Sequence, residues 1–99
     1  MQDRKLDLEA SKIAVLPSMA MYNKFLNWVS GEFELFLQDD NYGLKVYFPQ
    51  GHLNIRLVQS HSTNIYFEIY VKSKNRPLGT RIHNQALDVL NQVYNVEKS

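Results

Sequence analysis

Four segments between residues 33 and 72 carry an apolar side chain at every second position. This period of two is typical of an antiparallel strand with one buried and one exposed face. The segments cover residues 33–38, 44–48, 53–58 and 65–72. The side chains predicted to face the core are Phe33, Leu35, Leu37, Leu44, Val46, Phe48, Leu53, Ile55, Leu57, Ile65, Phe67, Ile69 and Val71. The opposite face is mixed, so the pattern predicts a sheet with one apolar side and one side open to other contacts.

Three short connectors join these segments at residues 39–43, 49–51 and 60–64, and they contain residues that turns prefer. Connectors of this length predict a meander, in which the strands lie side by side in chain order. Matching the inward residues across each turn gives a trial register, because a slip of one residue turns every side chain over. In that register Glu34 faces Tyr47, Tyr47 faces Asn54, Asn54 faces Tyr70, and Arg56 lies between Lys45 and Glu68.

Ahead of the sheet, residues 18–30 carry a wide apolar arc at helical spacing, with Pro17 before it and Gly31 after it. This segment is predicted to be a helix that ends at Gly31. Residues 1–16 are less regular, since some of their apolar residues fit a helical stripe whereas residues 13–16 also fit a short extended segment. We expect a helix in this part of the chain as well.

After the sheet, residues 77–79 precede a second apolar arc, and Thr80 is the expected N-cap of a helix there. Residues 95–99 are expected to fray. The resulting order is α-β-β-β-β-α within one domain that spans residues 1–99. Laying the helices across the apolar face of a four-stranded antiparallel meander buries both apolar surfaces. We therefore predict an α+β fold, a two-layer sandwich with the helices packed on one face of the sheet.

The composition fits one domain and excludes several kinds of site. The chain has 99 residues, no Cys, and 11 Lys and Arg against 10 Asp and Glu, and globular domains centre at roughly 100–150 residues. Without Cys there is no disulfide framework, thiolate zinc site or cysteine nucleophile. No apolar run approaches the roughly 18 residues of a membrane span, and the charged start of the chain is unlike a signal peptide. We therefore expect a cytoplasmic protein that does not bind membranes.

Charge is balanced overall but unevenly placed along the chain. Four acidic residues, Glu32, Glu34, Asp39 and Asp40, occur where there is no base between residues 25 and 44. The stretch from residue 72 to residue 81 has basic residues and no acid. Because a meander places its first and last strands at opposite edges, this distribution predicts one acidic and one basic edge.

The basic stretch also leads into the predicted start of the second helix, where backbone N–H groups favour an anion. The candidate residues for binding a small anionic ligand there are Lys72, Lys74, Arg76, Thr80 and Arg81. The alternative is a solvated connector whose lysines keep an edge strand from pairing with another chain.

The outer face of the predicted sheet carries aromatic and basic side chains that no other segment clearly covers. The candidate partner-binding residues are Phe36, Tyr47, Arg56, Tyr66 and Tyr70. Tyr and Arg are enriched at protein interfaces, which predicts a binding surface for another protein or a second copy of the chain. The same residue types stack on single-stranded nucleic acid, although a net charge of +1 disfavours a strong phosphate binder. A third interpretation is cross-strand packing in which Glu68 pairs with Arg56.

No arrangement in the sequence points to catalysis, a metal or a cofactor. The three histidines, His52, His61 and His83, are not expected to converge on one site, because the first two lie at opposite ends of one predicted strand. The predicted protein is thus a non-enzymatic interaction module, such as an adaptor, inhibitor or assembly factor, that uses the outer face or an edge of its sheet. The alternatives are weak binding of single-stranded nucleic acid and binding of a small anion at the second helix.

Overall fold

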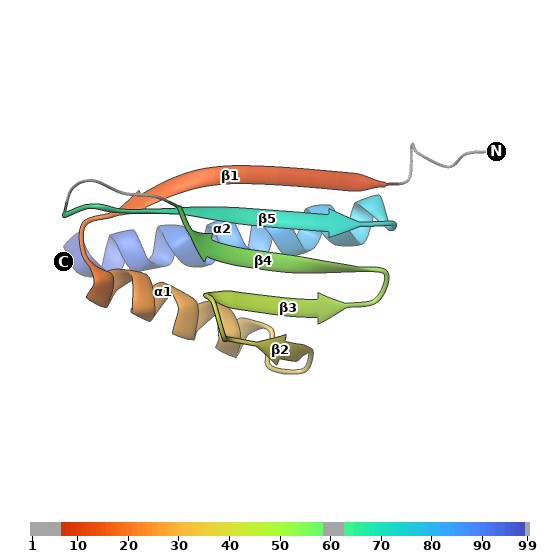
Figure 1. The fold of residues 1–99 in the computed structure, drawn as a ribbon, viewed down its shortest axis with the longest axis horizontal. Helices are drawn as coiled ribbons and strands as arrows, with labels where there is room; N and C mark the ends of the chain where they lie inside the picture. The colour runs from red at the N-terminus through yellow and green to blue at the C-terminus, as the bar shows by residue number, and fades with distance from the viewer. Residues whose placement is uncertain (1–6, 59–62, 99) are drawn as a thin grey trace.

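In the computed structural model, which describes residues 7–58 and 63–98, the chain forms a five-stranded antiparallel sheet with two helices on one of its faces (Figure 1). The elements in chain order are β1 (Leu8–Leu16), α1 (Met19–Glu32), β2 (Leu37–Asp39), β3 (Leu44–Phe48), β4 (Gly51–Leu57), β5 (Ile65–Ser73) and α2 (Arg76–Lys98). The strands lie across the sheet in the order β1-β5-β4-β3-β2. The predicted α+β class and the single antiparallel sheet are confirmed. The predicted order α-β-β-β-β-α is found from α1 to α2, but the sheet has five strands where four were predicted, because a further strand precedes α1.

That further strand is β1, which occupies residues 8–16, where a helix over residues 1–16 was expected. Residues 1–6 lie outside the described part of the chain. β1 pairs with β5 along its whole length, and its inward positions are Leu8, Ala10, Lys12, Ala14 and Leu16. Lys12 stands opposite the buried Ile69 but remains exposed, because β1 is an edge strand. One lysine in the middle of the inward set therefore hides the period of two in the sequence.

The segment predicted as the first strand, residues 33–38, is mostly a turn that follows α1. The Phe36 backbone N–H donates to the Phe33 carbonyl oxygen at 2.9 Å, which closes that turn. Leu35 and Leu37, both predicted to face the core, are 94% and 74% exposed. Only the short strand β2 at the end of this segment pairs with β3. The alternation here results from aromatic residues that close one end of the core and leucines that face solvent.

The faces predicted for β3, β4 and β5 are largely confirmed. The buried side chains from these strands are Leu44, Val46, Phe48, Leu53, Ile55, Phe67, Ile69 and Val71. Leu57 departs from the prediction and is exposed, because it ends β4 at a point where β3 does not extend beside it. Part of the predicted connector, together with His61, lies outside the described residues.

The register of the meander differs from the trial register at the turn between β3 and β4. The turn is only two residues long, with Gln50 at a φ of 69°, so Phe48 stands opposite Gly51. This places Tyr47 opposite His52, where Asn54 was expected, and Lys45 opposite Asn54. On the β2 side Tyr47 faces Leu37, where Glu34 was expected. On the β4 side the shift is by two residues, so those side chains keep their predicted face. On the β2 side the shift is by three residues, which turns Leu37 from the predicted inner face to the outer face.

Two predicted pairs between β4 and β5 are confirmed. Asn54 stands opposite Tyr70, and Arg56 stands opposite Glu68. Lys45 is not the other neighbour of Arg56, because it pairs with Asn54.

The core lies between the inner face of the sheet and the helices. The helices contribute Tyr22, Phe25, Val29, Ile82, Ala86, Val89, Leu90 and Val93 to it. The Phe67 ring lies 5.1 Å from the Tyr22 ring and 5.3 Å from the Phe25 ring, measured between centroids. Because full burial of one such side chain contributes about 1.5–3 kcal/mol, this layer is the main source of stability. It also leaves the other face of the sheet uncovered by helix.

The first helix starts close to the predicted position but ends later than predicted. The Ser18 hydroxyl accepts the Met21 N–H at 3.2 Å. Gly31 lies inside the last turn and does not terminate the helix, because the chain continues to Phe33 as the C-cap. The Phe33 N–H donates to the Val29 carbonyl oxygen at 3.1 Å, which keeps the helical pattern past the glycine.

The second helix starts four residues before Thr80, the N-cap expected from the sequence. The Asn75 side-chain oxygen accepts the Leu78 N–H at 3.1 Å and so caps the first turn. Pro77 is tolerated in that turn because its missing N–H would have no intrahelical partner there. The helix continues to Lys98, through most of the segment expected to fray.

Candidate interaction surface on the sheet

Within the described residues, both helices contact the inner face of the sheet, so no helix covers the outer face. The outward side chains form rows across the strands from β2 to β1. The rows are Leu37, Tyr47, His52, Lys72 and Glu9; then Asp39, Lys45, Asn54, Tyr70 and Ser11; then Arg56, Glu68 and Ile13; and finally Tyr66 and Val15. Polar groups occupy the centre of this face, and apolar side chains occupy two opposite corners.

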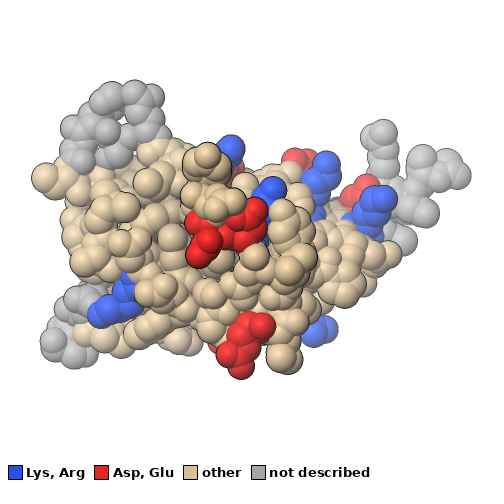
Figure 2. Space-filling model, turned by 60° about the horizontal axis from the view of Figure 1, so that its bottom comes forward, with Lys and Arg blue, Asp and Glu red and all other residues tan. Residues whose placement is uncertain are grey.

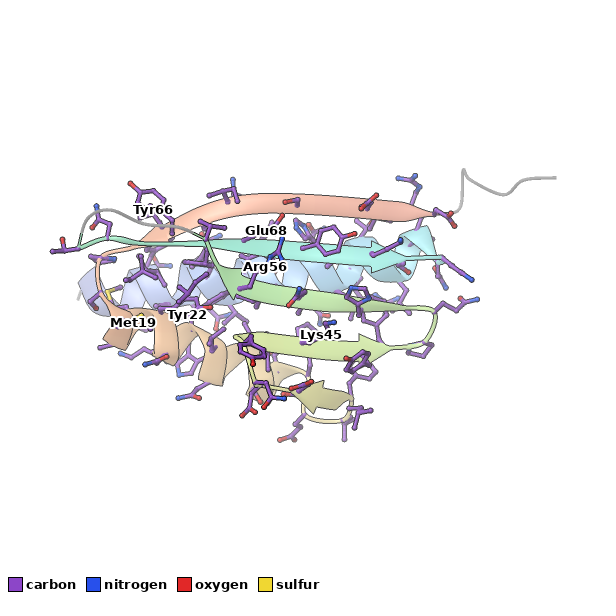
Figure 3. All side chains as sticks on the ribbon, in the orientation of Figure 1. Met19, Tyr22, Lys45, Arg56, Tyr66 and Glu68 are labelled. Atoms are coloured by element: carbon purple, nitrogen blue, oxygen red, sulfur yellow. The ribbon has the colours of Figure 1, made fainter. Side chains whose placement is uncertain are left out.

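The centre of the outer face is a hydrogen-bonded network around the Glu68 carboxylate. The Ser11 hydroxyl donates to Glu68 Oε2 at 2.6 Å, and Arg56 Nε donates to Oε1 at 3.1 Å. Figure 3 shows Arg56 and Glu68 on adjacent strands, directed toward each other. The Ser11 hydrogen bond, with help from Arg56, lowers the pKa of Glu68 below its ordinary value. The network satisfies these charges within the protein and ties β1 and β4 to β5.

A second contact at the centre joins β5 to the edge strand. The Tyr70 hydroxyl donates to Glu9 Oε2 at 2.6 Å, and this hydrogen bond raises the pKa of Tyr70 to about 12. On the other side, the ring of His52 lies 6.0 Å from the Tyr70 ring. Partial burial lowers the pKa of His52, and the nearby cations Lys45 and Lys72 lower it further. Tyr70 is therefore held between an acid and a neutral ring.

One apolar corner of the outer face lies at the β1 edge, and we call Ile13, Val15 and Tyr66 the β1 corner. Val15 stands opposite Tyr66 across the β1–β5 pair, and Ile13 follows two residues away on the same face. Ile13 is 54% exposed, and the other two side chains are also solvent-accessible. Large apolar side chains that are contiguous and exposed are a common sign of a binding surface.

The apolar surface continues around the edge of β1 into a groove between this strand and α2. We call it the edge groove; its volume is about 370 Å³, and it is lined by Lys12, Ile13, Ala14, Val15, Leu87, Leu90, Asn91 and Tyr94. The Tyr94 hydroxyl donates to the Val15 carbonyl oxygen at 2.5 Å across the groove. Among the described residues, β1 has a neighbouring strand on one side alone, so half of its backbone N–H and C=O groups point away from the sheet.

The opposite corner, at the β2 edge, has a different character. Leu37 and Tyr47 are exposed there, and the Lys45 ammonium lies 5.7 Å from the centre of the Tyr47 ring. The acidic residues Glu32, Glu34, Asp39 and Asp40 are all exposed around this edge. Figure 2 shows this side of the molecule, where much of the surface is uncharged and acidic side chains gather near the middle. β2 has three paired residues, so it offers much less backbone for pairing than β1 does.

The structure brings together four of the five side chains predicted for partner binding. Tyr47, Arg56, Tyr66 and Tyr70 lie on the outer face of three adjacent strands. Phe36 does not, and its placement on that face was wrong. Its ring packs inward, 6.1 Å from the Phe33 ring and 6.5 Å from the Phe48 ring, because the turn after α1 directs it into the core.

The basic stretch has a different place from the one predicted. The strand β5 that carries Lys72 is an inner strand, because β1 occupies its other side, so the stretch does not follow a sheet edge. Thr80 and Arg81 lie in the second turn of α2, and the first turn is already capped by Asn75. Lys72 and Lys74 line a shallow pocket of about 390 Å³ together with Asp7, Glu9 and His52. The acids in this pocket oppose the binding of an anion.

Of the β1 corner, Tyr66 alone belongs to the site predicted from the sequence, and the edge groove is absent from that prediction. The signal that could have found them is the short apolar run at residues 13–16, which fits an extended segment. Its placement beside β5 depends on a pairing between residues more than 50 positions apart, such as Ser11 and Tyr70. No local pattern specifies such a pairing.

Two further features bear on what the surface can do. Among the described residues, no three His, Asp or Glu side chains are grouped so that they could hold a metal ion. His52 lies on the outer face, whereas His83 approaches the Ile69 carbonyl oxygen from α2 at 3.4 Å, so the two are on opposite sides of the sheet. In the described part of the chain, neither helix has the length and apolar character needed to cross a membrane.

The chain matches no known protein-family model, and no curated protein has a significantly similar sequence.

Proposed function

We propose that this protein is a non-enzymatic interaction module that binds another protein along the β1 edge of its sheet. The observation that carries the proposal is the coincidence of a nine-residue edge strand, which among the described residues has a neighbouring strand on one side alone, with exposed apolar side chains on both faces of that edge. Proteins usually protect such edges with short strands, prolines or charges, and β1 has one such feature, the inward-facing Lys12. Here the β1 corner lies on the outer side of the edge, and the edge groove lies on its inner side, toward α2. An edge of this kind suits a partner that adds a strand to the sheet.

The contrast between the two edges supports the choice of β1. The β2 edge is short and surrounded by exposed acidic residues, which are the features that discourage strand pairing. The β1 edge has Lys12 as its one basic side chain and Glu9 as its acid within the strand, and Glu9 is engaged by Tyr70. The apolar character of β1 is thus not offset by a concentration of charge.

The alternative of nucleic-acid binding has weaker support from the geometry. Glu9 and Glu68 lie among the tyrosines and basic residues of the outer face, and they hold Tyr70 and Arg56 by hydrogen bonds. Acidic groups at these positions repel a phosphate backbone, which supplies most of the affinity in such complexes.

Site-specific photo-cross-linking in the producing cells tests the proposal. The photoreactive residue p-benzoylphenylalanine replaces Tyr66 in the β1 corner or, as a control, Tyr42, which is 93% exposed in the turn before β3. We expect covalent adducts of defined mass from position 66 that disappear when Ile13→Glu is added. Equal adducts from positions 66 and 42, or adducts that persist with Ile13→Glu, contradict the proposal. The absence of any adduct at position 66 contradicts it as well.

A further inference from the structure

The edge groove restricts what kind of strand can pair with β1, and this inference rests on the proposed function. An added strand directs alternate side chains to the inner side of the sheet, where the groove lies. The groove is lined on the α2 side by Leu87, Leu90 and Tyr94 and on the β1 side by Ala14. Its volume of about 370 Å³ can hold more than one large side chain. A strand whose inward residues are small would leave it empty.

A second copy of the chain would supply such a strand. If β1 pairs antiparallel with β1 of another copy, the inward residues brought to the groove are Ala10, Lys12 and Ala14, since Leu8 and Leu16 pack in their own core. The two alanines are too small to fill the groove. The two Lys12 ammonium groups would also lie on the same side of the joined sheet, where like charges repel. The geometry therefore disfavours a second copy as the occupant.

Lys12 adds a charge preference to the shape of the groove. Its side chain is exposed at one end of the lining, whereas Val15 and Tyr94 mark the other end. The rest of the lining is apolar apart from Asn91. A partner side chain that lies beside Lys12 is favoured if it is acidic.

We infer that the β1 edge binds an extended segment of a different protein, with large apolar side chains at positions i and i+2 and an acidic side chain at i+4. With the segment antiparallel to β1, the apolar side chain at i+2 lies opposite Ala14, between it and the α2 residues Leu87 and Leu90. The apolar side chain at i lies opposite Leu16, beside Tyr94 at the other end of the groove. The acidic side chain lies beside Lys12. The main-chain groups of the segment pair with the outward N–H and C=O groups of β1 other than the Val15 carbonyl, which already accepts the Tyr94 hydroxyl.

Synthetic peptides of matched composition test this inference by fluorescence polarisation with the purified chain. The probe is Thr-Phe-Thr-Leu-Thr-Glu-Thr, in which Phe, Leu and Glu share one face when the peptide is extended. The control is Thr-Thr-Phe-Leu-Thr-Glu-Thr, in which Phe and Leu point to opposite faces. We expect the probe to bind roughly tenfold or more tightly than the control, since one apolar side chain is lost from the groove. Equal binding of the two peptides, or binding of neither, overturns the inference.

A charge exchange tests the role of Lys12 separately. The variant Lys12→Glu should bind the probe a few-fold more weakly and should prefer a peptide with Lys in place of Glu, because an exposed ion pair contributes about 0–1 kcal/mol. Leu87→Ala should weaken binding of the probe, whereas Val96→Ala, an exposed position on α2 outside the groove, should not. An unchanged peptide preference in Lys12→Glu contradicts the assigned place of the acid.

Light scattering of the purified chain decides whether the β1 edge binds a segment of a different protein or a second copy of the chain. We expect a monomer. A dimer that Ile13→Glu dissociates would overturn the inference, because the partner at the β1 edge would then be a second copy of the chain. If neither peptide binds but position 66 still gives adducts that Ile13→Glu removes, this inference is overturned and the proposed function stands.

Discussion

The Tyr94 hydroxyl, near the end of α2, donates a hydrogen bond to the carbonyl oxygen of Val15 on the edge strand β1 at 2.5 Å. The two residues are 79 positions apart in the sequence. This contact fixes the distance between the edge strand and the helix below it, and so it defines one end of the edge groove. The shape of the candidate binding surface therefore depends on the last turns of α2.

Removal of that hydroxyl should loosen the edge without unfolding the protein. We expect Tyr94→Phe to lower the free energy of unfolding by about 1 kcal/mol, the usual net contribution of one hydrogen bond. Amide hydrogen exchange in β1 should become faster than in the wild-type chain. The exposed Tyr42→Phe serves as the control and should change neither quantity. Unaltered exchange in β1 would show that Tyr94 does not position the edge.

Unlike the Tyr94 hydroxyl, the Tyr22 hydroxyl is buried without a hydrogen bond in the described part of the chain. Tyr22 is 2% exposed, and among the described residues its hydroxyl has no hydrogen-bond partner. Burial raises its pKa to about 12. Because an unsatisfied buried hydroxyl carries a desolvation cost of about 1–3 kcal/mol, Tyr22→Phe should stabilise the fold while keeping the ring contact with Phe67. Urea denaturation measures the change, and a less stable variant would mean that the hydroxyl does have a partner.

Two glycines should respond in opposite ways to substitution by alanine. Gly43 has a φ of 111°, and a Cβ there would lie 2.1 Å from the Ile55 carbonyl oxygen. Gly31 lies in α1, and a Cβ there would meet nothing within 4 Å. We expect Gly43→Ala to cost at least about 1–3 kcal/mol from backbone strain, and Gly31→Ala to add about 0.5–1 kcal/mol to stability. Thermal unfolding of the two variants compares them directly, and equal effects would contradict the turn geometry before β3.

The Glu68 network predicts a dependence of stability on pH. The pKa of Glu68 is lower in the folded chain than its ordinary value, chiefly because of the Ser11 hydrogen bond. Such a group stabilises the fold above the pKa it has in the unfolded chain, and the contribution is lost as the pH falls through the lower pKa of the folded state. The difference in free energy of unfolding between the wild type and Glu68→Gln should therefore shrink as the pH is lowered from about 7 to about 3. A difference that stays constant over this range would contradict the network.

The sequence predicts the middle of the sheet well because the information there is local. The alternating residues of β3, β4 and β5 are buried on one face, and these strands lie side by side in chain order, as their short connectors predict. The pair Arg56 and Glu68 follows from that order, and it is found as predicted. Where short turns join strands with one apolar face, the pattern alone is sufficient.

The predictions made from the sequence are wrong at both edges of the sheet, for two physical reasons. In β1, Lys12 occupies an inward position that an edge strand can leave in solvent, so the alternation is broken. After α1, Phe33, Leu35 and Leu37 recur at every second position as in a strand, although residues 33–36 form a turn and the two leucines are exposed. Edges are less completely buried than the centre, and burial is what imposes the pattern.

The candidate site shows the same contrast between the centre of the sheet, where the prediction is correct, and its edges, where it is not. Tyr47, Arg56, Tyr66 and Tyr70 were assigned to the outer face correctly because they belong to β3, β4 and β5. The edge groove was not foreseen, since it requires α2 to lie beside β1, and that packing joins the two ends of the chain. Long-range contacts of this kind carry the features proposed here to bind a partner.

The most direct test of the β1 edge as the binding surface is a comparison of cross-linking at the two edges of the sheet. The photoreactive residue replaces either Ile13 on β1 or Leu37 on β2, which are 54% and 74% exposed. If accessibility alone governed the yield, position 37 would give more adduct. The account predicts that position 13 gives the adduct and position 37 gives little or none. A yield at position 37 equal to or greater than that at position 13 would contradict it.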